Sequence, residues 1–511
     1  MIPAACALGL DLGTSSAKAV VLSVSGAVLA QASAGYPVIS AEPGYAESDP
    51  RRWWSAVVSC TREAVAAAGG PPPVAIGLSG QMHGLVMTAA DGRALRPALL
   101  WADSRATGSL RAYRELGRAA LDRLANPLFP GMAGPLLAWV AAHEPSVYDG
   151  SRWALSPKDW LRGRLTGEIH AEPSDASATL LYDVAGDRWD LGVVEALGLD
   201  AGKLAPLLPS AAAVAGRLTA SAAAELGLPA GLPVAAGAGD TAAAVLGSGI
   251  SGLSDIQLTV GTGAQVIRPV AAPVNRAEAG VHLFRLASPS GWYQMGATLS
   301  AGLSLNWVRE VLNASWEELY ASASGPSGPS GSSGSSGSSG DPVFVPHLTG
   351  ERTPYCDPSL RGSWTSLALA SDRASLLRSA LEGTAFAIRD ALDALLGPAG
   401  LGPAGPAPAC LRLAGGGTVA TGWRQLLADV LGVPLYAVDV PAASGRGAAL
   451  LGAIAAGLLG FDDCAGALAP PAALAAEPDQ GRVAWYAERH VRFQGVVSAL
   501  RSHSRAQEGS S

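Results

Sequence analysis

The chain has 511 residues, which is more than one hydrophobic core usually supports, so we expect two domains of about 250 residues each. Hydrophobic residues make up 49% of the sequence and charged residues 15%, and the formal net charge is −7. This composition is ample for two cores but provides no basic face, which argues against nucleic acid or an anionic membrane as a partner.

The cysteines and histidines indicate the cellular environment and whether a structural metal site is expected. The 5 cysteines are scattered and never form a Cys-x-x-Cys pair, which predicts a reduced, cytoplasmic environment. The 7 histidines show no metal-ligand spacing, so we expect no structural zinc site. We expect no membrane span, because no run of about 18 uninterrupted apolar residues occurs. We also expect no signal peptide, because residues 1–10 lack a positive flank.

The first predicted element carries a polar turn at its end. Residues 8–19 read Leu-Gly-Leu-Asp-Leu-Gly-Thr-Ser-Ser-Ala-Lys-Ala, an apolar strand that runs into an aspartate and then into glycine and hydroxyls. The pattern places the Asp11 carboxylate and the Thr14 hydroxyl beside free backbone N–H groups, where a metal–phosphate group could dock. It indicates phosphoryl transfer, although a strand that ends in Asp-x-Gly is often only a turn.

The next elements are a hairpin and a helix. Ser25-Gly26 interrupts apolar strands, which predicts that the early part of the sheet is antiparallel. A helix then opens at Pro50, with Asp49 as its N-cap, and stops at residues 69–70, which are both glycine.

Two more strand ends in the first half carry polar residues. The strand at 74–78 ends in Ser-Gly-Gln-Met-His-Gly, and residues 233–241 run from a strand through a turn and Asp240 into a helix. Loops at strand ends carry the sites of open α/β sheets, so both segments are candidates. We place the domain boundary just beyond the second one, near residues 249–253.

The second half repeats the first motif. Residues 258–267 read Leu-Thr-Val-Gly-Thr-Gly-Ala-Gln-Val-Ile, and a strand at 411–413 enters the glycines at 415–417. Two such turns suggest a duplicated domain that grips one nucleotide. The Gly-Ser run at 324–340 predicts a flexible surface loop, and residues 501–511 a frayed end. The remaining expected elements are helices at 299–312, 373–396, 422–431 and 448–456 and a strand at 435–438.

Other glycine-rich phosphate sites are excluded by their spacing. The chain has no Gly-x-x-x-x-Gly-Lys-Ser/Thr, no His-Arg-Asp catalytic loop, and no complete dinucleotide fingerprint around residues 415–417. Phosphate binding therefore requires a different fold.

An ordered set of motifs resembles the FGGY carbohydrate kinases through almost the whole chain. Gln-Met-His-Gly, Pro-Lys-Asp-Trp and Ser-Asp-Ala-Ser are most similar to the D-xylulose kinases within that family. The motifs are Gly-Leu-Asp-Leu-Gly-Thr-Ser (9–15), Gly-Gln-Met-His-Gly (80–84), Leu-Trp-Ala-Asp-Ser-Arg (100–105), Ser-Pro-Lys-Asp-Trp-Leu (156–161), Ser-Asp-Ala-Ser (174–177), Gly-Asp-Thr-Ala-Ala (239–243), Gly-Glu-Arg-Thr-Pro (350–354) and Gly-Gly-Gly-Thr-Val-Ala-Thr-Gly-Trp-Arg-Gln (415–425).

The resemblance implies an α/β fold of two ribonuclease-H-like domains, like those of actin and hexokinase, around a central cleft. On this interpretation residues 1–250 form the N-terminal, sugar-binding domain. Residues 251–490 form the C-terminal, ATP-binding domain, which contains the Gly-Ser loop, and residues 491–511 form a tail.

The resemblance also assigns the catalytic groups. Asp240 matches the catalytic base, which accepts the proton of the sugar hydroxyl as its oxygen attacks the γ-phosphorus of ATP. Asp11 matches the aspartate that orients Mg²⁺ with the phosphates. Asp240 could instead cap a helix that starts at Thr241, and Asp11 could simply form a turn.

The remaining assignments are ligand contacts. His83 as a buried structural histidine, and the glycines as sites of close helix–strand packing, stay open as alternatives. The implied sugar contacts are Met82, His83, Trp101, Asp103, Arg105, Asp240 and Thr241, and the implied ATP contacts are Thr14, Thr262, Gly263, Gly302, Asn306, Gly416, Gly417 and Thr421.

The chain departs from the xylulose kinases in its sugar-binding segments. Thr241 stands where they typically carry asparagine, and Ala102 and Ser104 replace a common asparagine and glycine. D-xylulose is the expected substrate, phosphorylated at O5, while D-ribulose or a pentitol remains open. A non-catalytic, nucleotide-dependent protein of the same fold is a third hypothesis, and the assembly state is open, a homodimer included.

Overall fold

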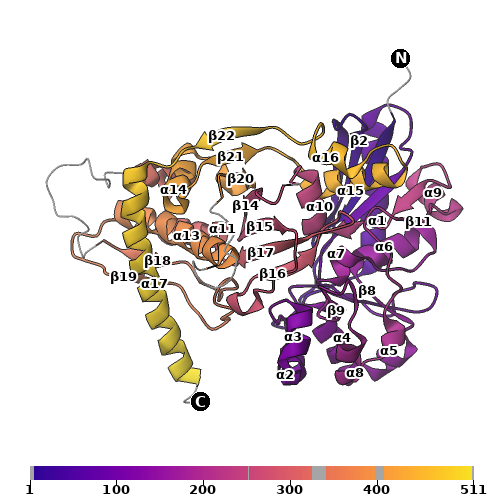
Figure 1. The fold of residues 1–511 in the computed structure, drawn as a ribbon, viewed down its shortest axis with the longest axis horizontal. Helices are drawn as coiled ribbons and strands as arrows, with labels where there is room; N and C mark the ends of the chain where they lie inside the picture. Colours follow the sequence, from indigo (N-terminus) through magenta and orange to yellow (C-terminus); the bar gives the residue numbers. More distant parts are fainter. Residues whose placement is uncertain (1–4, 251, 325–340, 398–407, 509–511) are drawn as a thin grey trace.

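The computed structural model describes residues 5–250, 252–324, 341–397 and 408–508 (Figure 1). The Gly-Ser run expected as a surface loop lies, apart from Ser324, outside these residues. Within them, no helix is both long enough and apolar enough to cross a membrane.

The first half is built on a seven-stranded sheet. Its first three strands are antiparallel, β5 runs parallel to β1, and β12 and β13 run parallel to β5, whereas the edge strand β11 is antiparallel. The order is β11 (Val214–Arg217), β12 (Pro233–Ala235), β5 (Ile76–Gly80), β1 (Cys6–Leu12), β2 (Ser16–Ser23) and β3 (Val28–Gly35), with β13 (Ala238–Gly239) also on β5.

The second half repeats this pattern. β14 pairs antiparallel with β15 and parallel with β20, and β20 runs parallel to β21. In the first sheet, β1 likewise pairs antiparallel with β2 and parallel with β5, and β5 runs parallel to β12. The expected α/β fold with a duplicated strand pattern is confirmed. The order is β16 (His282–Arg285), β17 (Trp292–Thr298), β15 (Ala264–Val270), β14 (Ile256–Val260), β20 (Leu411–Ala414), β21 (Leu435–Val438) and β22 (Ala472–Ala476).

Helix boundaries follow the predicted caps. Helix α1 (Pro50–Ala68) starts after Asp49, whose carboxylate accepts the N–H of Arg51, and ends at Gly69 in the left-handed conformation with φ 63°. The predicted helices near 299–312, 373–396 and 422–431 are α11 (Gly302–Val311), α13 (Arg373–Leu396) and α14 (Thr421–Leu431). The hairpin at Gly26, with φ 84°, is also confirmed.

Smaller elements complete both halves. Those of the first half are β4 (Glu47–Ser48), β6 (Val86–Thr88), β7 (Ala98–Leu99), β8 (Trp153–Leu155), β9 (Tyr182–Asp183), β10 (Arg188–Trp189), α2 (Leu110–Glu115), α3 (Arg118–Leu124), α4 (Ala133–His143), α5 (Pro145–Gly150), α6 (Pro157–Thr166), α7 (Pro173–Ala176), α8 (Leu191–Ala196) and α9 (Ala220–Leu226). Those of the second half are α12 (Trp316–Ala321), β18 (Val343–Val345), β19 (Ser363–Thr365) and α16 (Phe461–Ala465).

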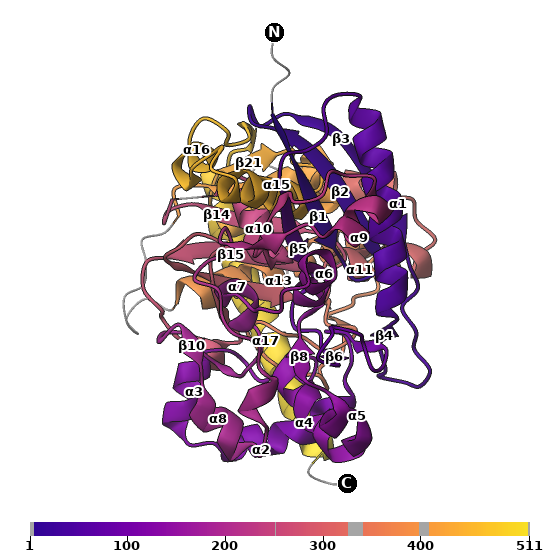
Figure 2. The ribbon, with the colours of Figure 1, turned by 90° about the vertical axis from the view of Figure 1, so that its right-hand side faces the viewer.

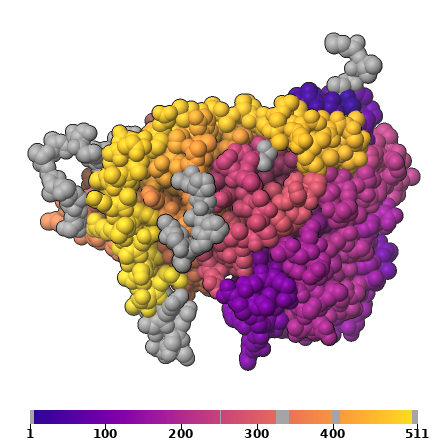
Figure 3. All heavy atoms as spheres, viewed as in Figure 1, coloured from indigo at the N-terminus to yellow at the C-terminus, as the bar shows by residue number. Residues whose placement is uncertain are grey.

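Two helices form the junction between the halves. Helix α15 (Ala443–Ala455) comes late in the chain but packs on the first sheet, and it lies beside α10 (Asp240–Gly247) in both ribbon views (Figures 1 and 2). Glycine makes this contact possible, because a Cβ on Gly77 would lie 1.8 Å from the carbonyl oxygen of Ala448. In the space-filling view, the yellow atoms of the late segments accordingly lie against the indigo and magenta atoms of the first half (Figure 3).

The C-terminal segment differs from the expectation. Residues 491–511 were expected to be a tail, with fraying from Arg501, but helix α17 (Gln480–Glu508) runs through that boundary (Figure 1). Phe493 and Val497, one helical turn apart, are buried in the core of the second half. The tail assignment was wrong because this apolar pair belongs to a packed helix face.

Candidate active site

Three strand ends of the first sheet meet at one edge. In the register of the sheet, Asp11 on β1 lies opposite Ser79 on β5, and Ser79 in turn lies opposite Ala238 on β13. The hydroxyl of Ser79 donates to Oδ1 of Asp11 at 2.7 Å. Since β13 leads directly into Asp240, the sheet brings Asp11 and Asp240 to the same edge.

The two carboxylates influence each other electrostatically. Burial raises the pKa of Asp240 to about 7, and the negative charge of Asp11 contributes to the rise. Burial also raises the pKa of Asp11, while the Ser79 hydrogen bond and the Lys18 charge oppose that effect. The edge therefore holds one carboxyl group that titrates near neutral pH, as a general base should.

The start of helix α10 bears on the capping alternative for Asp240. The helix begins at Asp240 itself, with Gly239 as the N-cap residue. Oδ1 of Asp240 accepts the backbone N–H of Thr241 at 2.6 Å and its hydroxyl at 3.2 Å. Asp240 thus satisfies one N–H of the first turn without being the cap, and both of these bonds are to the same carboxylate oxygen.

The geometry of His83 fixes its tautomer. Its Nδ1 lies 2.8 Å from the carbonyl oxygen of Ala178, and since a carbonyl can only accept, Nδ1 carries the proton. Burial lowers the pKa of His83 to about 4, so the ring is neutral near pH 7. Nε2 is then a hydrogen-bond acceptor. Met82, the residue before His83, is buried, and its sulfur accepts a hydrogen bond from the Tyr293 hydroxyl at 3.7 Å.

Trp101 and Thr14 are joined directly. The indole Nε1 of Trp101 donates to Oγ1 of Thr14 at 2.9 Å, which connects a predicted sugar contact with a predicted phosphate contact. The turn before Thr14 is fixed as well, because the carbonyl of Gly13 accepts from the Tyr36 hydroxyl and from Nε2 of Gln81.

Asp103 and Arg105 have partners within the protein. The carboxylate of Asp103 is fully buried and accepts the N–H of Ala46 at 2.8 Å together with Nε and Nη2 of Arg105. The same guanidinium pairs with Glu47 at 2.7 Å and lies over the ring of Tyr45. These bonds tie the Trp101 loop to the segment around β4.

The glycine turn of β14 and β15 contacts the start of α11. Gly302 N–H donates to the carbonyl of Gly261 at 3.0 Å, and Leu303 N–H donates to that of Thr262 at 2.9 Å. A Cβ on Gly302 would lie 2.5 Å from the Gly261 oxygen, so only glycine fits. The structure therefore brings Thr262, Gly263 and Gly302 together.

The third glycine turn lies at the adjacent strand end. β14 and β20 are parallel, with Thr259 opposite Ala414, so the glycines after Ala414 follow the same edge. Gly416 is exposed, and a Cβ there would meet nothing within 4 Å. Gly417 and the exposed Thr421, the first residue of α14, continue this surface. Asn306 lies on the first turns of α11, where its amide pairs with Glu310 and Arg309.

A buried charge cluster supports the segment that carries Asp240. Lys158 Nζ lies 2.5 Å from Asp159 and 3.4 Å from Glu172, and none of the three is appreciably exposed. Glu172 accepts the hydroxyl of Ser174, and that hydroxyl accepts the N–H of Gly239 at 3.0 Å. The residue before Asp240 is thus bonded to α7.

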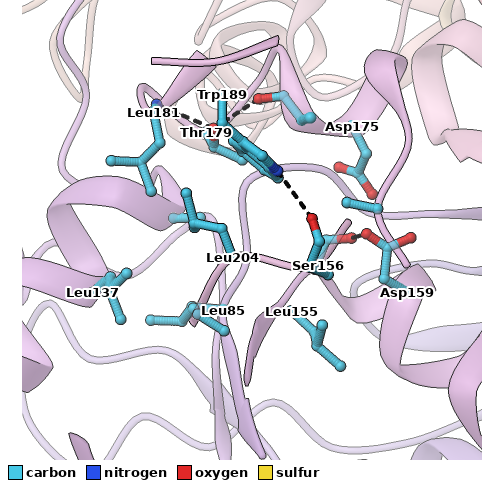
Figure 4. A pocket seen from close by; sticks show the side chains of 15 residues that line it. Leu85, Leu137, Leu155, Ser156, Asp159, Asp175, Thr179, Leu181, Trp189 and Leu204 are labelled. Atoms are coloured by element: carbon cyan, nitrogen blue, oxygen red, sulfur yellow. Dashed lines mark hydrogen bonds between the residues drawn. The ribbon is translucent and has the colours of Figure 1, made fainter. Parts of the chain in front are cut away.

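A cavity of about 30 Å³ borders this cluster (Figure 4). Aliphatic side chains such as Leu137 lie on one side of it, and Asp159 and Asp175 lie on the other (Figure 4). Burial raises the pKa of Asp175 to about 8, and its carboxyl oxygens have no hydrogen-bond partner among the described residues, although Nζ of Lys158 lies 3.8 Å from Oδ2. The volume suits about one or two water molecules, far less than a sugar.

The strand edge provides oxygen donors of the kind that Mg²⁺ prefers. Asp11 and Asp240 supply carboxylates there, whereas the described part of the chain holds no cluster of three or more metal-binding side chains. Mg²⁺ usually keeps several waters and takes one or two carboxylates plus substrate phosphates, so this donor set fits it.

Sequence reasoning missed Ser79 and Tyr293, which bond to Asp11 and Met82, and Arg352, whose guanidinium lies over the Trp101 ring. Ser79 directly precedes the Gly-Gln-Met-His-Gly motif, and Arg352 lies inside Gly-Glu-Arg-Thr-Pro, so both were within reach of a closer analysis of those motifs. Tyr293 follows no motif, and only the pairing of the halves places it against Met82.

Known proteins match this chain over most of its length. The model of the N-terminal domain of the FGGY family of carbohydrate kinases matches residues 6–247, and the model of its C-terminal domain matches residues 257–456. The xylulose kinase of Klebsiella pneumoniae is 33% identical over 502 residues, covering 97% of this chain and 99% of that protein. That of Bacillus subtilis (strain 168) is 32% identical over 464 residues, covering 90% of each. A crystal structure of a xyloylose kinase from Brucella ovis matches with a TM-score of 0.87 at 34% identity, covering 97% of this chain and 99% of that one.

Proposed function

The chain belongs to the FGGY family of carbohydrate kinases, and from that premise we propose that it phosphorylates D-xylulose at O5 with ATP. The family makes it a phosphotransferase that uses ATP. The proposal for D-xylulose is supported by relatives named xylulose kinase that cover most of the chain. It is also supported by Met82, whose side chain lies against Gly239, the residue before Asp240, and by His83, which follows Met82 in the chain.

Asp240 is the proposed general base. Its carboxylate takes the proton from the O5 hydroxyl as O5 forms a bond to the γ-phosphorus, and the bond to the β–γ bridging oxygen breaks to release ADP. A pKa of about 7 leaves this carboxylate largely ionised at slightly alkaline pH and still basic enough to accept the proton. This match between burial, neighbouring charge and role is the observation that carries the proposal.

Asp11 is proposed to hold Mg²⁺ at the same edge. When bound, the ion neutralises negative charge on the phosphates during transfer. Asp11 presents its carboxylate from a fixed position, because Ser79 bonds one oxygen and strand β1 is buried on both sides.

The sugar contacts are proposed at the edge of the first sheet. Nε2 of His83 accepts a hydroxyl hydrogen, and the side chain of Met82 packs against the carbon skeleton. Trp101 forms a wall of the pocket, and Asp103 with Arg105 holds its loop through the bonds to Ala46 and Glu47.

The nucleotide contacts are proposed on the glycine turns. Thr14 from the first half and Thr262 with Gly263 from the second face the phosphates, and Gly302 with Asn306 lies near the ribose. The adenosine is approached by the exposed Gly416 and Thr421 and by the partly exposed Gly417. On this proposal residues 1–250 bind the sugar and the following half binds ATP.

A second candidate substrate is D-ribulose or a pentitol. The Thr241 hydroxyl already donates to Asp240 at 3.2 Å, so this residue offers a sugar less than the amide of asparagine would. A pocket with one donor fewer at this position could favour a different arrangement of hydroxyls.

A panel of sugars with coupled ADP detection tests the proposal. D-xylulose, D-ribulose, xylitol, ribitol and glycerol are compared by kcat/KM, and phosphorus NMR of the product identifies the phosphorylated oxygen. D-xylulose should give the highest kcat/KM, with phosphate on O5. A higher value for another acceptor would contradict the substrate assignment, and the absence of ADP release with all five would contradict the proposed function.

A further inference from the structure

Arg352 comes from the second half but lies against aromatic rings of the first. Its guanidinium carbon is 4.2 Å from the ring centre of Phe129 and 5.4 Å from that of Trp101. Trp101 is in turn bonded to Thr14 through its indole N–H. The guanidinium therefore lies where the halves meet, next to the proposed sugar pocket.

This cation has no counter-ion among the described residues. The adjacent carboxylate, Glu351, is already engaged by Nδ1 of His347 at 2.9 Å and by the N–H of Leu299 at 2.7 Å. Arg352 is partly exposed, but its Nε is buried and has no hydrogen-bond partner among the described residues. A buried donor without a partner is unfavourable, and it is stabilised when a ligand supplies an acceptor oxygen.

The groups whose pKa responds to the charge of Arg352 indicate where Arg352 lies. Its positive charge lowers the pKa of His83 and of His282. Together with the contact between its guanidinium and the Trp101 ring, these effects place Arg352 close to His83 and His282.

We propose that Arg352 binds the sugar directly, donating hydrogen bonds to oxygens at the end remote from the phosphorylated hydroxyl. This inference rests on the function proposed above, in which O5 lies at Asp240. In a 2-ketose the remote end carries the carbonyl at C2, whose oxygen can only accept hydrogen bonds. Arginine can only donate them, so the two groups are complementary, and the flanking rings hold the guanidinium in place.

The proposal has a consequence for selectivity. His83 contributes an acceptor and Arg352 contributes donors, so the pocket distinguishes hydroxyl hydrogens from a carbonyl oxygen. A pentitol lacks the carbonyl and presents a hydroxyl there, which must place its own hydrogen away from the guanidinium. Arg352 should therefore favour ketoses over pentitols, and it makes sugar binding depend on both halves of the chain.

Arg352→Met and Arg352→Lys test this role, with Arg361→Met as the matched control. Arg361 follows in the same segment, but it is exposed, and among the described residues its guanidinium donates to the carbonyls of Pro358 and Leu360. We expect Arg352→Met to raise KM for D-xylulose about 10- to 100-fold, with KM for ATP changed less than about 2-fold. The Lys variant should show a smaller rise, and the preference for D-xylulose over xylitol should fall in both.

Calorimetric titration of the sugar into each protein gives the dissociation constant without turnover. An unchanged sugar affinity in Arg352→Met, or an equal loss of ATP affinity, would overturn the proposal. If Arg352→Met does not fold, Arg352→Lys decides by the same criteria. If the wild-type protein prefers another sugar, the function proposal fails. The role of Arg352 is then tested by comparing the affinity of the wild type and the Arg352 variants for that preferred sugar.

Discussion

Asp11 and Asp240 lie far apart in the sequence, yet the charge of one raises the pKa of the other. The parallel pairing of β1 and β13 with β5 brings about this proximity. Burial is the largest cause of the shift, and the two bonds from Thr241 oppose it. The chemistry proposed for the protein depends on this balance at a single carboxyl group.

Asp240→Asn should nearly abolish turnover. The amide keeps the size of the side chain but cannot take the proton of the sugar hydroxyl, and the loss of a general base costs about 10²–10⁴-fold in kcat. ATP binding, measured by calorimetry, should persist. Asp149→Asn, at an exposed position of α5, serves as the control. Wild-type kcat in Asp240→Asn would show that Asp240 is not the base.

The raised pKa of Asp240 also predicts how stability depends on pH. The folded protein holds this proton up to a pH of about 7, whereas the unfolded chain releases it near the ordinary value of 3.8. The stabilisation from this proton is therefore complete below the lower value and is lost as the pH rises through about 7. Asp240→Asn avoids the loss because its side chain is always neutral.

Thermal unfolding in EDTA tests the predicted direction of this pH dependence. Relative to wild type, Tm of Asp240→Asn should increase between about pH 5 and about pH 8. A Tm difference that is the same at both pH values would mean that Asp240 titrates at its ordinary pKa. With wild-type protein, kcat/KM should fall as the pH drops below about 7, because the base becomes protonated.

His83 and Thr241 together test the sugar preference. His83→Ala removes the acceptor Nε2 and should raise KM for D-xylulose by about 10-fold or more. Loss of a hydrogen-bond partner for a bound hydroxyl weakens binding by about 1–3 kcal/mol. Thr241→Asn should keep or improve activity on D-xylulose. Steady-state kinetics with D-xylulose and D-ribulose decide, and an unchanged KM in His83→Ala would contradict the contact.

At the scale of elements, α15 holds the halves together through small residues. A Cβ on Gly9 would lie 2.0 Å from the carbonyl oxygen of Gly445, and one on Gly447 would lie 1.9 Å from that of Ala243. Close backbone approach at these points lets α15 lie against both β1 and α10. The glycines are therefore required for packing between elements and not for turns.

Gly77→Ala should be destabilising. The added methyl group would lie 1.8 Å from the carbonyl oxygen of Ala448, so α15 must shift away from β5. Overpacking of this kind costs about 1–3 kcal/mol and sometimes more. Gly108→Ala is the control, because a Cβ there meets nothing within 4 Å. Urea unfolding measures both variants, and equal midpoints would contradict the packing argument.

At the scale of the molecule, long-range contacts join the halves and complete the second core. Asn126 in the first half donates to the carbonyl of Leu283 on β16 at 2.9 Å and accepts the N–H of the same residue at 3.1 Å. The Tyr293–Met82 contact lies nearby, between the proposed sugar pocket and the second sheet. Helix α17 then covers the core that contains α13 and α14 (Figure 1).

Truncation after His490 should destabilise the second half. It removes Phe493 and Val497, which are 0% and 1% exposed, and the loss of a single buried Phe side chain costs about 3–5 kcal/mol. Since domains are stable by only about 5–15 kcal/mol, the shortened protein should unfold at a much lower temperature or be insoluble. Truncation after Glu508 is the control. Unchanged Tm after the longer deletion would restore the tail assignment.

The sequence by itself determined the local features of this protein. The cap at Asp49, the turn at Gly26 and the bounds of α13 follow from residues within one turn of each other, so their chemistry can be recognised in the chain alone. The order of the strand-end motifs likewise predicted the duplicated fold. These predictions succeeded because caps, turns and alternating apolar patterns act over short distances.

Only the tertiary structure decided which distant residues meet. The placement of Arg352 on Phe129 and Trp101, the contact of α15 with the first sheet, and the burial of Phe493 all join segments far apart in the chain. Asp103 and Arg105, expected at the sugar, turned out to have partners within the protein. Such contacts depend on strand order and on the packing of one half against the other, which no local pattern encodes.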